Sequence, residues 1–205
     1  MILKKFVELP LENNNYLLID ETSKEAALID ASHYDEKILE ELKLHNAKLK
    51  YILLTHAHFD HILGVEKLAK ATGAKVVLHP DDKKLLKDLN TYTYMVGMPS
   101  ADIPHIDIFI NDGEDIKLGE TIIRTIHTPG HTQGGCSYLF ENKLFSGDTL
   151  FKESIGRTDL AGGSFQTLEK SIKDKLYVLP DNTIVYPGHG PETNIGHEKK
   201  YNSYI

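Results

Sequence analysis

Cysteine is almost absent from this chain of 205 residues, and the single one, Cys136, excludes a disulfide within the chain. No apolar run approaches the roughly 18 residues that a membrane-spanning helix needs. The N-terminal segment, MILKKFVELPLENNNY, carries charges inside its apolar part, so we expect no signal peptide there. These three absences together predict a cytoplasmic protein without a membrane partner.

Basic residues are also scarce, since 23 Lys and Arg stand against 30 Asp and Glu, and the formal net charge is −7. A general nucleic-acid-binding protein would show a basic face, so we expect no nucleic-acid partner. Internal repeats, low-complexity tracts and linker-like stretches rich in Gly, Ser or Pro are lacking as well. We therefore predict a single domain over residues 1–205. Nothing in the sequence indicates an oligomeric state.

What is present in the first third of the chain is an α/β pattern. Strands are predicted over residues 16–20, 25–30, 50–55 and 75–79, and helices over 33–45 and 62–72. Asp35 is the expected N-cap of the first helix, and Gly73 ends the second. The unit of strand, loop, helix and strand over residues 50–79 indicates an α/β protein.

The second half contains more strands, separated by turn residues. We predict strands over 121–127, 136–140, 143–146 and 183–188, a helix over 164–176 with Ser164 as its N-cap, and a terminal helix from 194. Residues 90–105 fit no period, which is typical of a lid or a binding loop. Sheets mixed with outer helices predict a layered α/β sandwich.

Residues 55–61 read THAHFDH and follow the predicted strand 50–55. The segment brings His56, His58, Asp60 and His61 together. Such a segment can be a polar surface loop, or it can be half of a metal site whose other half lies further along the chain. The remaining sequence has to distinguish these two alternatives.

Three more potential ligands stand in the same setting, directly after a strand and a glycine. His131 lies in TPGHTQGG, Asp148 in FSGDTL and His189 in YPGHGPE. Binding residues on loops at strand ends, held by a rigid sheet, are a common arrangement. Each of the three would more often be an ordinary residue if it stood alone. Their repetition favours the metal site.

Imidazole nitrogen and carboxylate oxygen suit zinc and similar divalent ions. His56 and His58 project to the same side of an extended backbone, so with His131 they would supply three nitrogens to one ion. The second ion would take Asp60, His61 and His189. Asp148 has two oxygens and would bridge the two ions. A structural zinc site is disfavoured because such sites are rich in cysteine.

The four segments THAHFDH, HTPGHTQGG, FSGDTLF and YPGHG, in this order, resemble the metallo-β-lactamase superfamily, and within it the glyoxalase II (hydroxyacylglutathione hydrolase) group. The similarity extends to NNNYLLID near the start and IGRTDLAGG after Asp148. It implies a four-layer αββα sandwich, with two mixed β-sheets flanked by helices and a dinuclear site at one edge. All seven metal positions of the group are filled, and its members are associated with zinc, and also with iron or manganese.

The chain departs from the common β-lactamases and from long glyoxalase II enzymes, and it resembles a short bacterial subgroup of the latter. The common β-lactamases have Cys at the place of Asp148 and lack the ligand His61, which disfavours antibiotic hydrolysis as the main activity. Gly135 stands where long glyoxalase II enzymes carry His, and GHGPET replaces their GHEYT. The chain ends 16 residues after His189, so we expect the helical extension that helps to hold glutathione to be missing.

The expected function is that of a metal-dependent hydrolase that cleaves a thioester such as S-lactoylglutathione. Two metal ions would generate hydroxide at neutral pH, with Asp60 and Asp148 as catalytic ligands. The positive charge of the ions favours a small anionic substrate. Arg157 would contact the substrate or form a structural salt bridge, and Tyr94, in the segment 90–105, would line the pocket or lie on the surface.

Three alternatives remain at this point. A mono-iron persulfide dioxygenase shares the scaffold and much of the motif. A hydrolase of other esters or lactones would use the same two ions. A metal-binding or interaction module would have no turnover at all.

Overall fold

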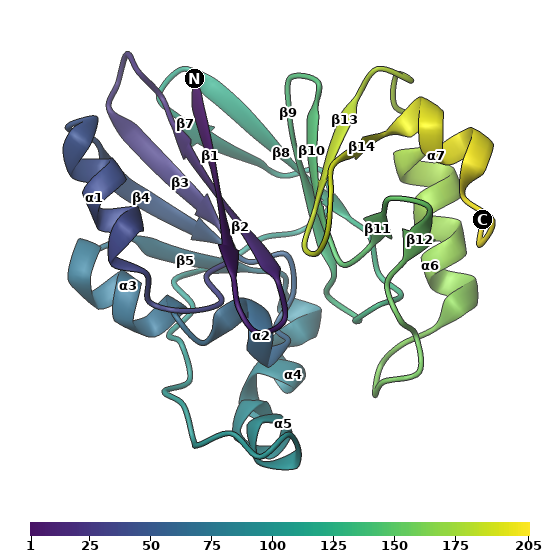
Figure 1. Ribbon diagram of the computed structural model, residues 1–205, viewed down its shortest axis with the longest axis horizontal. Helices are drawn as coiled ribbons and strands as arrows, with labels where there is room; N and C mark the ends of the chain where they lie inside the picture. Colours follow the sequence, from purple (N-terminus) through teal and green to yellow (C-terminus); the bar gives the residue numbers. More distant parts are fainter.

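Two six-stranded sheets face each other in the computed structural model, which describes residues 1–205 (Figure 1). The first sheet has the order β1 (Ile2–Glu8), β2 (Asn13–Ile19), β3 (Glu25–Ile29), β4 (Lys48–Leu53), β5 (Lys75–Leu78) and β6 (Ile108–Phe109). The second has the order β14 (Thr193–Asn194), β13 (Ile184–Pro187), β10 (Lys143–Gly147), β9 (Cys136–Phe140), β8 (Thr121–His127) and β7 (Asp115–Leu118). Both sheets mix parallel and antiparallel pairs.

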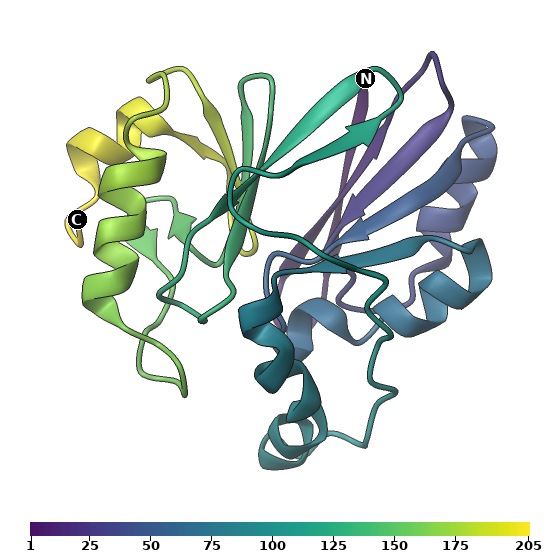
Figure 2. The ribbon, with the colours of Figure 1, turned by 180° about the vertical axis from the view of Figure 1, so that it is seen from behind.

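Helices cover the outer face of each sheet (Figure 2). On the first sheet lie α1 (Glu36–Leu44) and α3 (Val65–Thr72). On the second lie α6 (Phe165–Ser171), its π-helical continuation η2 (Ile172–Leu176), and α7 (Ile195–Tyr201). The four-layer αββα sandwich is therefore confirmed. None of the helices combines the length and the apolar character that a bilayer crossing requires.

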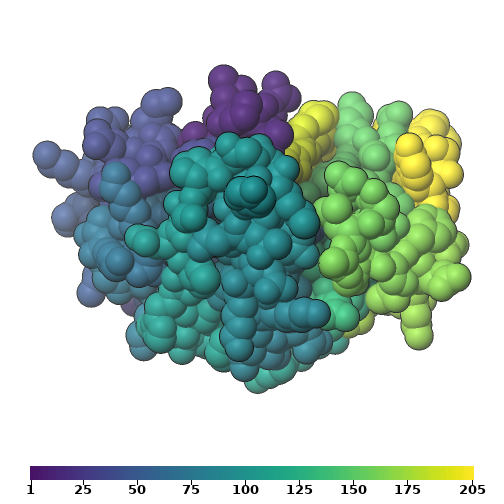
Figure 3. Space-filling model, turned by 90° about the horizontal axis from the view of Figure 1, so that it is seen from below, coloured from purple at the N-terminus to yellow at the C-terminus, as the bar shows by residue number.

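Several short elements lie at the lower edge of the sandwich. They are α2 (Phe59–Ile62), the 3-10 turn η1 (Pro80–Asp82), α4 (Lys83–Lys87) and α5 (Leu89–Met95). The small hairpin of β11 (Leu150–Phe151) and β12 (Ser154–Ile155) lies higher, beside α6 (Figure 1). Figure 3 views the lower edge from below, with the teal residues around α5 standing toward the reader. The prediction of a structureless segment over 90–105 is thus wrong in its first part, because α5 buries Leu89 and Thr93 against the rest of the molecule.

Most of the other predicted elements are present with shifted ends. Asp35 caps α1 by accepting a hydrogen bond from Lys37 N, and Gly73 ends α3 with φ +72. The helix predicted over 62–72 is divided, because α2 ends at Ile62 and α3 starts at Val65. The edge strand β1 was not predicted. Its residues are half-buried or exposed, so its sequence lacks a clear alternation.

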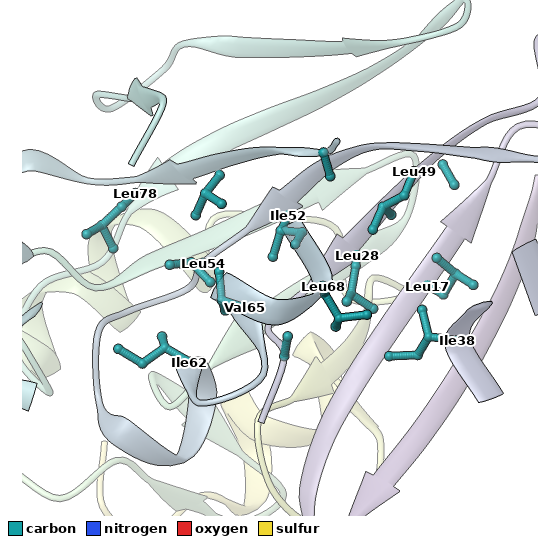
Figure 4. Packing of buried hydrophobic residues seen from close by; sticks show 14 of the residues in the cluster. Leu17, Leu28, Ile38, Leu49, Ile52, Leu54, Ile62, Val65, Leu68 and Leu78 are labelled. Atoms are coloured by element: carbon teal, nitrogen blue, oxygen red, sulfur yellow. The ribbon is translucent and has the colours of Figure 1, made fainter. Parts of the chain in front are cut away.

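Three apolar clusters join the layers. The largest lies between the first sheet and its helices, where Leu17, Leu28 and Ile52 meet Ile38 and Leu68 (Figure 4). Successive residues of β2 point to opposite faces, and both faces are buried. Burial on both faces holds the strands of the sheet in place. The candidate site lies at the ends of such strands.

The second cluster fills the space between the two sheets. Tyr16 of β2 packs on Phe145 of β10 with ring centroids 5.2 Å apart, and Phe145 stacks on Tyr186 of β13 at 5.1 Å. Replacing a buried Phe with Ala costs about 3–5 kcal/mol in typical cores. These aromatic contacts hold β10 and β13, which carry Asp148 and His189 at their ends, against the first sheet.

Candidate metal centre

Four loops bring all seven predicted ligands to one edge of the sandwich. His56 and His58 follow β4, and Asp60 and His61 lie in α2. The other three follow strands of the second sheet: His131 follows β8, Asp148 follows β10, and His189 follows β13. The edge is the lower one in Figure 1, where α2 is labelled. The first sheet therefore supplies four of these side chains and the second sheet three.

The first triad consists of His56, His58 and His131, which are all buried. One ligand atom from each lies within 4.8 Å of the others. His58 Nδ1 is 2.9 Å from His131 Nε2, and the two rings meet edge to face. Three imidazole nitrogens that converge in this way form a suitable set for one divalent ion.

The second triad consists of Asp60, His61 and His189, again within 4.8 Å of one another. Asp60 Oδ2 is 3.5 Å from His189 Nε2 and 3.8 Å from His61 Nε2. The set offers one carboxylate oxygen and two imidazole nitrogens, which is also suitable for a divalent ion.

Asp148 lies between the two triads. Its Oδ1 is 3.4 Å from His61 Nε2, and its Oδ2 is 3.6 Å from His131 Nε2. Oδ2 is also 3.5 Å from His189 Nε2. The carboxylate thus faces both triads, which is the position that a bridging ligand requires.

Three buried ligand atoms in this cluster have no hydrogen-bond partner within the protein: His56 Nε2, His61 Nε2 and Asp148 Oδ1. Leaving one buried polar atom unpaired costs about 1–3 kcal/mol. Three such atoms at one place therefore indicate a binding site for an electron-pair acceptor. Because all three can donate a lone pair to a cation, the donor set fits divalent metal ions.

The opposite ring nitrogens are held by the surrounding protein. His61 Nδ1 donates to Asp30 Oδ2 at 2.8 Å. Asp30 also accepts hydrogen bonds from the backbone N and the hydroxyl of Thr55, each at 2.8 Å. The Thr55 hydroxyl in turn lies 3.0 Å from His56 Nδ1. A protonated Nδ1 leaves Nε2 bare, so one aspartate orients a ligand in each triad.

Backbone carbonyls hold the other two Nε2 ligands. His131 Nδ1 donates to Arg157 O at 2.7 Å, and His189 Nδ1 donates to Leu11 O at 3.0 Å. His58 is the exception, since it presents Nδ1 to the cluster.

Two further side chains, which the sequence did not single out, support the loops. Asn13 donates to Asp60 Oδ2 at 3.0 Å. Asp82 accepts hydrogen bonds from Ala57 N at 3.0 Å and from the Thr132 hydroxyl at 2.9 Å. It therefore ties the THAHFDH loop to the loop that carries His131.

The electrostatics differ between the triads. Burial lowers the pKa of His58 to about 3 and holds that of His56 well below its ordinary value, and neighbouring histidines add to both effects. Burial opposes charge at His61 and His189 too, but nearby carboxylates outweigh it and raise both pKa values. Despite its burial, the pKa of Asp148 falls to about 2 because His61 stands beside it. The environment thus favours the neutral form of His56 and His58 and the protonated form of His61 and His189.

The glycine that precedes His189 makes room for the bridging carboxylate. A Cβ atom on Gly188 would lie 2.2 Å from Asp148 Oδ1 and 2.9 Å from His61 Cε1. No side chain can be accommodated there without moving a ligand. The strand, glycine and ligand order seen in the sequence therefore has a steric reason at this position.

The two predicted substrate contacts lie elsewhere. The guanidinium of Arg157 is exposed and forms a bidentate pair with Asp159 at 2.7 Å, so its salt-bridge alternative is the arrangement that the structure has. Tyr94 lies on α5 with 83% of its side chain exposed. A substrate role for both stays a prediction.

A further cluster of His79, Asp81 and His127 also brings ligand atoms within 4.8 Å. The two imidazole rings are stacked with centroids 3.9 Å apart and planes at 9°. A metal ion lies close to the plane of each imidazole that binds it, and two parallel planes share no such point. This arrangement of the rings excludes joint ligation.

Comparison with known proteins gives one family. The family model described as the metallo-β-lactamase superfamily matches residues 9–189. A probable metallo-hydrolase of Bacillus subtilis, YqgX, is 36% identical over 200 residues, covering 96% of this chain and 93% of its own. The hydroxyacylglutathione hydrolase GloC of Haemophilus influenzae is 35% identical over 195 residues, covering 93% and 92%.

Solved structures show the same fold. The BLEG-1 B3 metallo-β-lactamase has a TM-score of 0.90 at 37% identity, with 99% of both chains covered. TTHA1623 in a di-iron-bound form has a TM-score of 0.88 at 34% identity, covering 98% of this chain and 100% of its own. ETHE1 from Myxococcus xanthus has a TM-score of 0.83 at 29% identity, covering 99% and 84%.

Proposed function

The chain belongs to the metallo-β-lactamase superfamily, and we propose that it is a metal-dependent hydrolase that cleaves a thioester at a dinuclear site. One observation carries the proposal, namely that Asp148 faces both triads with its two oxygens. The similarity to a hydroxyacylglutathione hydrolase supports a thioester such as S-lactoylglutathione as the substrate.

Two ions fit the side chains that are present. The first would be held by His56, His58 and His131, and the second by Asp60, His61 and His189, with Asp148 between them. When bound, such ions lower the pKa of a bound water toward about 7 and polarise a carbonyl oxygen. Zinc suits the histidine-rich set, and a relative solved in a di-iron-bound form supports iron as the alternative.

The residues of the chain position the reacting groups. Asn13 holds the Asp60 carboxylate, which can then accept a hydrogen bond from the attacking water and orient it toward the carbonyl carbon. Asp30 and Thr55 fix the rotation of His61 and His56. The leaving thiol has a pKa near ~8.5, so it departs as a thiolate without a dedicated acid.

The charge at the site favours an anionic substrate. Two divalent ions bring four positive charges, and Asp60 and Asp148 offset two of them. The remaining excess lies within a protein of net charge −7, so it is local to the centre. An acyl thioester of an anionic thiol fits this distribution of charge.

A second candidate is an oxidoreductase of the persulfide dioxygenase type, and the likeness to ETHE1 fits it. That chemistry uses one iron and consumes oxygen. Two complete triads favour the dinuclear hydrolase, because a mono-iron enzyme would not need the second triad and Asp148 together.

One experiment separates these functions. Purified protein is assayed for S-lactoylglutathione hydrolysis and, in parallel, for oxygen uptake with glutathione persulfide. We expect hydrolysis without oxygen uptake, and its loss in Asp60→Asn but not in the exposed control Asp174→Asn. Oxygen uptake without hydrolysis would select the second candidate. The likeness to a B3 β-lactamase adds a β-lactam to the panel, and we expect it to be turned over more slowly than the thioester.

A further inference from the structure

An apolar pocket of about 300 Å³ lies at the lower edge of the molecule, beside the second triad. Leu11 enters it from the turn between β1 and β2, Phe59 and Leu63 from α2 and its end, and Val96 and Met98 from the segment after α5. In Figure 3 the purple N-terminal hairpin lies against the teal segment of α5 at this place. The pocket is therefore formed by segments that are far apart in the sequence.

This pocket adjoins the candidate metal centre directly. Asp60 and Asn13 belong to its lining, and these two residues share the 3.0 Å hydrogen bond described above. The carbonyl of Leu11 accepts a hydrogen bond from His189 Nδ1, and the side chain of Leu11 lines the pocket. A group that fills the pocket therefore lies against Asp60, a member of the second triad.

The chemistry of the pocket selects an apolar group. Its lining contains no Lys or Arg, and its one carboxylate, Asp60, would repel an anion. A carboxylate of the substrate is therefore disfavoured here. Val96 is 54% exposed and Leu11 48%, so apolar surface is left to water unless a ligand covers it.

The opposite flank is polar. Next to His131 of the first triad lies a hollow of about 150 Å³. Its lining is mostly polar and consists of Asp81, Asp82, Lys84, Asp88, Thr132, Gln133 and Gly162, with Leu85, Tyr92 and Ala161 as its apolar members. The two flanks therefore differ in polarity, with the candidate ligands between them. A substrate with one apolar and one polar end can bind in a single direction.

From this asymmetry we infer that the pocket of Leu11, Phe59, Leu63, Val96 and Met98 binds the acyl chain of the substrate, and that thioesters of apolar acyl groups of about four to eight carbons are better substrates than acetyl or lactoyl thioesters. A water molecule occupies about 30 Å³ of liquid, so 300 Å³ has room for about ten atoms of this size. The thiol portion then lies outside this pocket. This inference rests on the proposed thioester hydrolase activity and names its substrate class.

The test compares acetyl, lactoyl, butyryl and hexanoyl thioesters of glutathione. A fully buried methylene is worth about a fourfold gain in kcat/KM, and for this open pocket we expect about tenfold or more from acetyl to hexanoyl. Val96→Asp should remove most of that preference. The matched control is Val178→Asp, because Val178 is 71% exposed on the other side of the molecule and should leave the ratio unchanged.

A binding measurement keeps the pocket testable if no thioester is hydrolysed. S-hexylglutathione and S-methylglutathione are thioethers and cannot be cleaved. Calorimetry should show the hexyl compound binding about tenfold or more tightly, with the difference reduced in Val96→Asp and kept in Val178→Asp. If hydrolysis is absent but this difference is found, the proposed function is wrong and the binding of an apolar chain in the pocket is confirmed. Equal binding of both thioethers, or equal kcat/KM for acetyl and hexanoyl thioesters, would overturn the inference that the pocket binds the acyl chain.

Discussion

Asp30 accepts a hydrogen bond from Nδ1 of His61 at 2.8 Å, and both side chains are fully buried. Through the Thr55 hydroxyl, the same carboxylate also orients His56. One residue outside the seven candidate ligands thereby sets the rotation of a ligand in each triad, which links the two triads mechanically.

Asp30→Asn tests this link. The amide keeps the shape of the carboxylate but puts an NH₂ group against one of the donors that Asp30 now accepts. We expect metal affinity to fall by about 10–100-fold, the range typical of residues that orient metal ligands. The measurement is a titration against a chelator of known affinity. Asp174→Asn, at an exposed position, is the control, and unchanged affinity in Asp30→Asn would contradict the link.

Gly188→Ala tests the steric account of the bridging carboxylate. The added methyl group would lie 2.2 Å from Asp148 Oδ1, so Asp148 has to move away from the triads. We expect the variant to lose bound metal and hydrolytic activity together.

Gly113→Ala is its control, because Gly113 has φ +77 and open space around its Cα. That variant should lose about 1–2 kcal/mol of stability through backbone strain and keep its metal. Full metal content in Gly188→Ala would show that Asp148 is not required where the structure places it.

The unequal pKa values of the two triads predict a pH-dependent second ion. Protons compete with metal at His61 and His189, whose pKa values are raised, so the affinity of the second triad should fall as the pH falls. His56 and His58 have lowered pKa values and are neutral already. Calorimetric titration of the metal-free protein between pH 5.5 and 8, in buffers of different ionisation enthalpy, should show proton release mainly with one of the two ions. Equal proton release with both ions would contradict the assignment.

The same raised pKa values affect the stability of the metal-free protein. The folded state binds these protons more tightly than the unfolded chain does. The resulting contribution to the free energy of unfolding is complete below about pH 6.5, the ordinary histidine value, and is lost as the pH rises through the folded pKa. Urea unfolding of the metal-free protein at pH 6 and at pH 9 measures whether this contribution to the free energy of unfolding falls as the pH rises. A contribution of His61 that grows with pH, taken as the difference from His61→Ala, would contradict it.

Arg157→Ala decides between the two roles considered for that side chain. Its guanidinium pairs with Asp159 at the surface, where water and salt screen the two charges. The carbonyl that holds His131 remains in the variant. If the role of Arg157 is structural only, we expect KM for the thioester to stay unchanged, because the side chain then makes no contact with the substrate. A rise in KM with unchanged kcat would instead establish Arg157 as a substrate contact.

The seven candidate ligands were visible in the sequence because each is a chemically distinctive residue at the end of a strongly apolar strand. The groups that hold these ligands in place could not be recognised from the sequence. Asp30 is 31 positions from His61, and the carbonyl of Leu11 is 178 positions from His189. A backbone carbonyl has no signature in the sequence, and a distant aspartate becomes a partner only when strands pair.

The elements that were misjudged share a weak local signal. In α5, the residues NTYTYM have modest helix propensity, and the helix forms because Leu89 and Thr93 are buried by tertiary packing. The strand β1 lies at the edge of its sheet and pairs with β2 along its whole length despite its mixed pattern. Both cases show packing that overrides local preference.

The metal content of the purified protein and of Asp148→Ala tests the central claim most directly, because that claim is a carboxylate shared by two ions. We predict two divalent ions per wild-type chain by elemental mass spectrometry. We predict no more than one in Asp148→Ala, together with the loss of thioester hydrolysis. A single ion in the wild-type chain, or two ions retained in Asp148→Ala, would contradict the account.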